Sequence, residues 1–89
     1  MSSVRLAFSS DGARSLSSMR EGSRGSILEV RSHAGGRADR LVALGVTAGA
    51  SVTVLQTFPG IVFLCDQTEL AIERGVGDAI LVRVQEISS

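Results

Sequence analysis

The feature that most limits what this chain can fold into is its division into short apolar runs of strand length, separated by turn residues. In the clearest run, 52–57, Val52 and Val54 alternate with Thr53 and therefore share one face of a strand. The runs with strand character are 27–30, 52–57, 61–65, 70–72 and 80–84. About five strands, this short and this evenly spaced, suit a small bent barrel better than a flat sheet, because closing a barrel removes the unpaired edges.

One segment, 37–44, has the spacing of a short helix. Ala38, Leu41 and Leu44 lie three residues apart and share one helical face. Gly45 follows where a chain leaves a helix with a positive φ, which only glycine adopts without strain. The sequence therefore predicts an all-β fold, a small barrel of about five strands with one short helix.

The length limits the chain to one domain, because 89 residues cannot bury two separate cores. We expect this domain to span 16–86 and to follow an N-terminal extension at 1–15. Within the extension, Val4, Leu6 and Phe8 alternate with other residues. This pattern predicts either a strand added to the edge of the sheet or a flexible segment.

The composition excludes several classes of function. Three Phe and no Trp or Tyr leave few platforms for stacking nucleic-acid bases, and a net charge of zero provides no field for a phosphate backbone. No apolar run approaches the roughly 18 residues that a membrane-spanning helix needs. The single Cys65 forms no intramolecular disulfide. We therefore expect a cytoplasmic protein that neither binds nucleic acid nor inserts into a membrane.

Catalytic residues are not expected either. The chain has a single histidine, His33, in a Gly-rich loop, and a nucleophile needs a base that is itself oriented by a third group. A phosphate-binding loop ends in Gly-Lys-Ser or Gly-Lys-Thr, and this chain contains no Lys. The sequence thus predicts a binding protein that is not an enzyme and holds no cofactor.

Residues 40–55 read Arg-Leu, two residues, Leu-Gly, an apolar residue, a small turn ending in Gly, and a valine-rich strand. This order closely resembles the signature of the FeoA family, ferrous iron transport protein A. The matching segments are 16–27, 40–55, 69–74 and 79–82. One departure is Ala48, which stands where the family usually has Pro.

The resemblance implies an SH3-like barrel that serves ferrous iron uptake as a small cytoplasmic accessory protein. Its implied partner is the cytoplasmic GTP-binding domain of a ferrous iron membrane transporter. A similar barrel forms the C-terminal domain of iron-dependent repressors, so the alternative interpretation is a sensor module that responds to a divalent metal. Self-association through exposed strands is a third interpretation.

The predicted contact surface combines one hairpin with the helix. The continuous apolar run at 61–65 cannot bury every side chain, since neighbours on a strand face opposite ways. Some of these residues are therefore expected to form an exposed apolar patch, unless the N-terminal segment covers them. The helix is adjacent to this face in the family's fold. The predicted partner-binding residues are Arg37, Arg40, Phe58, Pro59, Ile61 and Phe63. Arg40 has an alternative role, an ion pair with Asp39 or Glu69 that braces the barrel.

Metal ligands are a separate hypothesis. Side-chain oxygens of the related repressor barrel contribute to a metal site, which makes Asp66, Gln67 and Glu69 candidates, together with His33. These residues lack the spacing of a ligand set, and a solvated hairpin tip explains the first three equally well.

Overall fold

The computed structural model describes residues 13–31 and 37–85, with the backbone alone for 37 and 38. The described residues form six strands, β1 (Ala13–Ser15), β2 (Arg24–Val30), β3 (Ser51–Gln56), β4 (Ile61–Cys65), β5 (Thr68–Ile72) and β6 (Ile80–Gln85). They also form three short helical segments, the 3₁₀ helix η1 (Leu16–Ser18), α2 (Arg37–Ala43) and α3 (Arg74–Gly77). The predicted all-β class is confirmed, and β1 is a strand beyond the predicted five.

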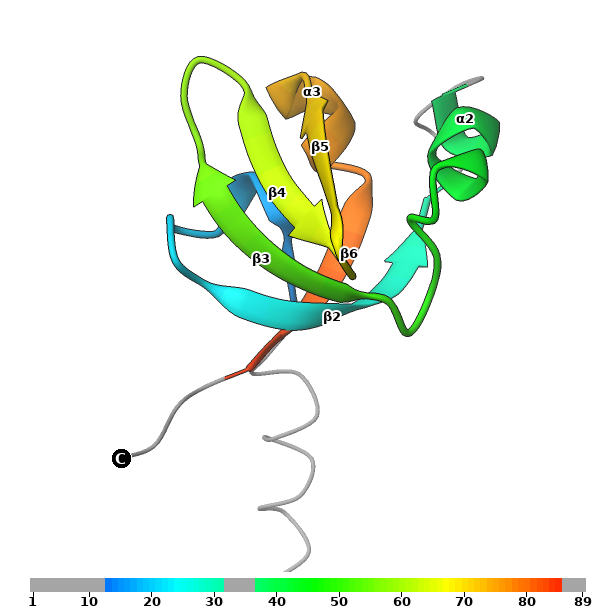
Figure 1. Ribbon diagram of the computed structural model, residues 1–89, viewed down its shortest axis with the longest axis horizontal. Helices are drawn as coiled ribbons and strands as arrows, with labels where there is room; N and C mark the ends of the chain where they lie inside the picture. The colour runs from blue at the N-terminus through cyan, green and yellow to red at the C-terminus, as the bar shows by residue number, and fades with distance from the viewer. Residues whose placement is uncertain (1–12, 32–36, 86–89) are drawn as a thin grey trace, which may run out of the picture.

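All six strands belong to one antiparallel sheet in the order β1-β6-β2-β3-β4-β5. The sheet bends strongly, so that β2 and β3 curve beneath the other strands (Figure 1). Register shifts at Ile27/Glu29 in β2 and at Val54/Gln56 in β3 mark the bends, since a bulge bends a strand and increases its twist. Within the described residues the sheet does not close: β1 and β5 are its two edges. Two edges therefore remain in the part of the chain that the structure describes.

The concave side of the bent sheet holds the core. Alternate residues of β3 and β4 point into it, because successive side chains of a strand face opposite ways. The largest fully buried side chains are Phe63, Leu16, Ile27, Ile61, Ile80, Val46, Val52, Val54 and Val82. The predicted alternation in 52–57 is confirmed, and Arg83 in β6 lies exposed between buried Val82 and half-buried Val84.

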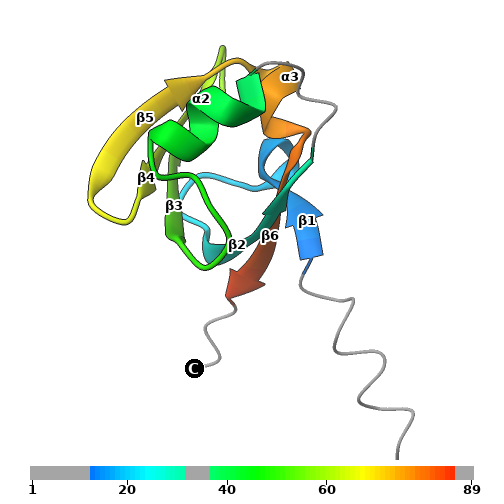
Figure 2. The ribbon, with the colours of Figure 1, turned by 90° about the vertical axis from the view of Figure 1, so that its right-hand side faces the viewer.

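Helix α2 stands beside the sheet rather than on it (Figures 1 and 2). It ends at Ala43, one residue earlier than predicted, and Gly45 then adopts the expected positive φ of 97°. Among the described side chains of α2, only Leu41 is buried. Leu41 is therefore the residue that anchors the described part of this helix to the barrel.

Two predictions concern residues that the structure does not describe. The alternating Val4, Leu6 and Phe8 lie outside the described residues, as does His33. In the described part of the chain, no helix has the length and apolar character to cross a bilayer.

Candidate functional site

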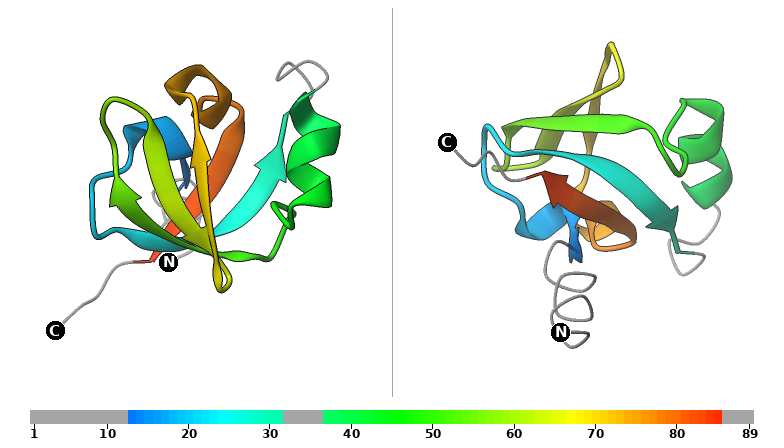
Figure 3. Two further views of the ribbon diagram at one scale, coloured as in Figure 1. Left: turned by 45° about the horizontal axis from the view of Figure 1, so that its top comes forward. Right: turned by 90° about the horizontal axis from the view of Figure 1, so that it is seen from below.

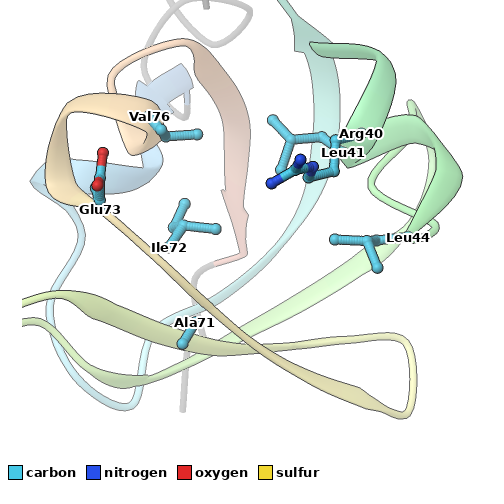
Figure 4. A pocket seen from close by; sticks show the side chains of 7 residues that line it. All are labelled: Arg40, Leu41, Leu44, Ala71, Ile72, Glu73 and Val76. Carbon is cyan, nitrogen blue, oxygen red and sulfur yellow. The ribbon is translucent and has the colours of Figure 1, made fainter. Parts of the chain in front are cut away.

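A groove opens between α2 on one side and β5 with α3 on the other. Its volume is about 310 Å³, and Figure 4 shows the side chains that line it. The lining residues are Arg40, Leu41, Leu44, Ala71, Ile72, Glu73 and Val76. Five of these are apolar and two are charged, so the groove has an apolar wall with one charge of each sign.

The α2 wall is held by the turn that ends the helix. The N–H of Val46 donates to the carbonyl oxygen of Leu41 at 2.9 Å, which folds the chain back beneath the helix. The thiol of Cys65 in β4 donates to the carbonyl oxygen of Gly45 at 3.4 Å. Leu41 is 3% exposed, whereas Leu44 lies beyond the helix end and is 47% exposed. Leu41 thus anchors the wall and Leu44 is left accessible beside the groove.

The opposite wall comes from the end of β5 and from α3. Ile72 is half-buried and Ala71 is exposed, in the alternation of a strand with one face on the core. The carbonyl oxygen of Glu73 accepts from the N–H groups of Val76 and Gly77, and this turn brings Val76 to the groove. Segments about thirty residues apart in sequence therefore build one site.

The guanidinium of Arg74 fixes α3 to two other segments. Nη1 donates to the carbonyl oxygen of Thr57 at 2.5 Å, and Nη2 donates to that of Ser17 at 3.2 Å. The hydroxyl of Ser17 also donates to Oδ1 of Asp78. These bonds tie the β3–β4 loop and η1 to the groove's α3 wall.

The hairpin part of the predicted contact surface needs correction. Ile61 and Phe63 are 0% exposed and belong to the core, so they cannot contact a partner in this fold. They occupy the buried positions of β4, while Val62 and Leu64 take the half-buried ones. Phe58 is 78% exposed in the β3–β4 loop, and Pro59 beside it is also exposed.

The helix and the hairpin tip are not adjacent, contrary to the prediction. Figure 1 and both views of Figure 3 place α2 and the β3–β4 loop at opposite sides of the molecule. Arg40 lines the groove, and no ion pair joins it to Asp39 or Glu69 in the described residues. Arg37 lies in α2, but its side chain is outside the described part of the structure.

The metal hypothesis gains no support from the β4–β5 hairpin. The main-chain N–H of Asp66 donates to the carbonyl oxygen of Ser51 at 2.8 Å, and Oδ1 of Asp66 accepts from the N–H of Ser51 at 3.0 Å. Asp66 also takes a positive φ of 56°, so it serves as a turn residue. Gln67 and Glu69 are exposed, and the described residues contain no group of three His, Cys, Asp or Glu side chains placed to hold a metal ion.

Cys65 precedes this turn and has a perturbed pKa. Burial removes its thiol from water, and the carboxylate of Asp66 adds a smaller repulsion, so both raise the pKa of the thiol above its ordinary value. Cys65 is 3% exposed, and its thiol acts as a donor to Gly45. The group is therefore a protonated core residue rather than a thiolate nucleophile or ligand.

The FeoA domain family matches residues 14–84, which is most of the chain. The chain belongs to the FeoA family. The FeoA structure described as an iron uptake regulatory protein is 28% identical, with a TM-score of 0.72 over 82% of this chain and 99% of that one. The FeoA protein from Chlorobium tepidum is 27% identical, with a TM-score of 0.73 over 85% of this chain and 74% of that one. No curated protein matches the sequence.

A manganese-dependent transcriptional repressor shares the fold of this FeoA chain. It is 18% identical, with a TM-score of 0.76 over 82% of this chain and 41% of the repressor. The predicted family and the predicted SH3-like all-β fold are both confirmed. The predicted contact surface included the helix that ends at Leu44, but no prediction from the sequence assigned Ala71, Ile72 or Val76 to a surface. These three residues meet α2 only in the folded chain, so no local pattern indicated them.

Proposed function

We propose that this FeoA protein is a cytoplasmic accessory protein of ferrous iron uptake that docks on the GTP-binding domain of a ferrous iron transporter. Membership of the FeoA family supports the link to ferrous iron uptake. The observation that supports docking is the apolar groove beside α2, whose rim carries Arg40 and Glu73. The proposed role contains no chemical step, so the groove acts by binding alone.

The groove has the composition of a small binding site. Leu44, directly after α2, lines the groove and is 47% exposed. Covering a large aliphatic side chain contributes up to about 1.5–3 kcal/mol, and a few such residues supply most of the energy of a typical interface. Arg40 and Glu73 add charges of opposite sign, which favour one orientation of the partner.

The proposal is tested by an amide chemical-shift titration of the ¹⁵N-labelled protein. The titrant is the isolated cytoplasmic GTP-binding domain of the transporter, loaded with GDP or with a GTP analogue. We expect the shifts to concentrate at 40–44 and 71–76, with the remote turn at 20–23 unaffected. The absence of shifts at partner concentrations in the hundreds of micromolar would refute docking on that domain.

A further inference from the structure

Strand β5 offers an unpaired edge beside the groove. It pairs with β4 on one side and is the last strand of the sheet in the described residues. A two-residue turn joins β4 to β5, so Cys65 and Thr68 are a hydrogen-bonded pair. Because such pairs alternate along an antiparallel ladder, the main-chain groups of Leu70 and Ile72 also point to β4. Those of Glu69 and Ala71 therefore point outward.

The same edge forms one wall of the groove. Ala71 and Ile72 line it, and Leu41 and Leu44 face them from the α2 side (Figure 4). A chain added along β5 would continue the sheet and place every second side chain on the face occupied by Leu70 and Ile72. That face adjoins the apolar wall. An extended chain thus matches both the backbone edge and the groove.

The charges along β5 and its two ends indicate which chain fits. Glu69 lies in β5, Asp66 lies in the turn before it and Glu73 lies directly after it, and no Arg lies between these acids. If two copies paired antiparallel through β5 around Ala71, Glu69 of each copy would lie opposite Glu73 of the other. Like charges directly opposite are destabilising, so this register disfavours a second copy of the chain. Basic residues at those two positions would instead be complementary.

We propose that the β5 edge binds an extended segment of a partner protein by strand addition. The segment carries basic residues opposite Glu69 and Glu73 and apolar residues at the two positions between them that face the groove. Main-chain hydrogen bonds to Glu69 and Ala71 provide the pairing, and the alternating side chains provide the specificity. The inference rests on the proposed function only for the origin of the segment, which would be the GTP-binding domain.

The probe is the peptide acetyl-Gly-Arg-Val-Thr-Val-Arg-Gly-amide, whose residue order is the same in both directions and therefore suits either strand direction. The measurement is amide hydrogen exchange of the labelled full chain with and without the peptide at millimolar concentration. We expect slowed exchange at Glu69 and Ala71, and little change at Leu70 and Ile72, whose amides already bond to β4. Shifts at Leu41 and Val76 without this alternating protection would overturn strand addition.

The contribution of charge complementarity to peptide binding is tested by reversing the charge at Glu69 and in the peptide. Glu69→Arg should weaken binding of the basic peptide by about threefold to tenfold and should strengthen binding of a peptide with Glu in place of both Arg residues. Glu21→Arg is the matched control, because Glu21 is an exposed acid in a turn that does not line the groove. Equal effects of the two substitutions would contradict a charge-specific edge.

The backbone contribution is tested by Ala71→Pro. The N–H of Ala71 points away from β4, so proline there removes an outward donor without removing a bond of the ladder. Binding of the basic peptide should fall about tenfold or more, while the amide spectrum of the other strands stays folded. If the peptide fails to bind the wild-type chain but the GTP-binding domain still shifts 40–44 and 71–76, strand addition is refuted and docking stands. If neither binds, both proposals fail.

Discussion

Gly25 lies in β2 between two paired strands, opposite Val52 of β3 on one side and Val84 of β6 on the other. A Cβ atom at this position would collide with the carbonyl oxygen of Arg83 and lie 2.8 Å from Cγ1 of Val82. Both neighbours belong to the central part of the sheet and cannot move independently. The close approach of β2 to β6 therefore depends on the missing side chain.

Gly25→Ala should lower the free energy of unfolding by about 1–3 kcal/mol, because the added methyl group overpacks a rigid site. Gly75→Ala is the matched control, since Gly75 lies in α3 with no atom within 4 Å of its Cβ position. The control should be neutral or stabilise by up to about 1 kcal/mol through helix propensity. Urea denaturation measures both variants, and equal costs would contradict the close approach.

Cys65 predicts a dependence of stability on alkaline pH. The folded state raises the pKa of its thiol, so above about pH 8.5 the unfolded chain loses this proton first. The free energy of unfolding should therefore fall as pH rises from about 8.5 towards the folded-state pKa, by up to about 1.4 kcal/mol per pH unit. The chain has no Lys and no Tyr, so no other side chain ordinarily titrates in this range.

The control for this prediction is Cys65→Ala. This variant should be less stable below about pH 8.5, because it removes a buried side chain, but its stability between about pH 8.5 and 10 should be nearly constant. Urea denaturation at several pH values measures both slopes. An equal slope in the variant would show that the dependence comes from another group.

At the scale of elements, the β3–β4 hairpin places its two phenylalanines, Phe58 and Phe63, in opposite environments. Phe63 is 0% exposed inside the barrel, and Phe58 is 78% exposed in the loop. Phe63→Ala should cost about 3–5 kcal/mol through lost burial and a cavity, whereas Phe58→Ala should change stability by less than about 0.5 kcal/mol. Comparable urea midpoints for the two variants would contradict this assignment of strand faces.

Arg74 links three elements through one side chain, since it reaches Thr57 in the β3–β4 loop and Ser17 in η1 from its place in α3. Arg74→Lys keeps the charge, but an ammonium group lacks the planar guanidinium that donates to both carbonyl oxygens at once. It should lower the free energy of unfolding by about 1–2 kcal/mol and speed amide exchange in the loop 57–60. Arg14→Lys, at an exposed site in β1, is the control and should change neither. Unchanged loop exchange in the Arg74→Lys variant would show that Arg74 does not hold the loop.

On the scale of the whole molecule, two exposed apolar places lie on opposite sides. One is Leu44 in the groove beside α2, and the other is Phe58 in the β3–β4 loop. The groove is concave and has charges at its rim, whereas Phe58 is 78% exposed in a loop. One partner domain would have to wrap around the barrel to reach both.

We therefore expect Leu44→Ser to weaken binding of the GTP-binding domain by about tenfold and Phe58→Ser to leave it nearly unchanged. Both residues are largely exposed, so both variants should stay folded, which thermal melting checks. Isothermal titration measures the affinities. The reverse order of effects would move the docking surface to the hairpin and away from the groove.

Local patterns in the sequence determined the strands and their turns. The alternation of Val52 with Val54 follows from the period of two that any strand imposes, and Gly45 follows from the positive φ at the end of a helix. The signature at 40–55 also sufficed for the family and hence the fold. These properties depend on neighbours in the chain, which the sequence displays directly.

The tertiary structure alone decided which faces and edges remain open. The run at 61–65 is apolar at every position, so its periodicity is the same whether Ile61 and Phe63 or Val62 and Leu64 face the core. The bends of β2 and β3 settle that choice, and they also leave β5 as an edge opposite α2. The groove joins residues about thirty positions apart, and its existence depends on how far the bent sheet closes, which no local pattern encodes.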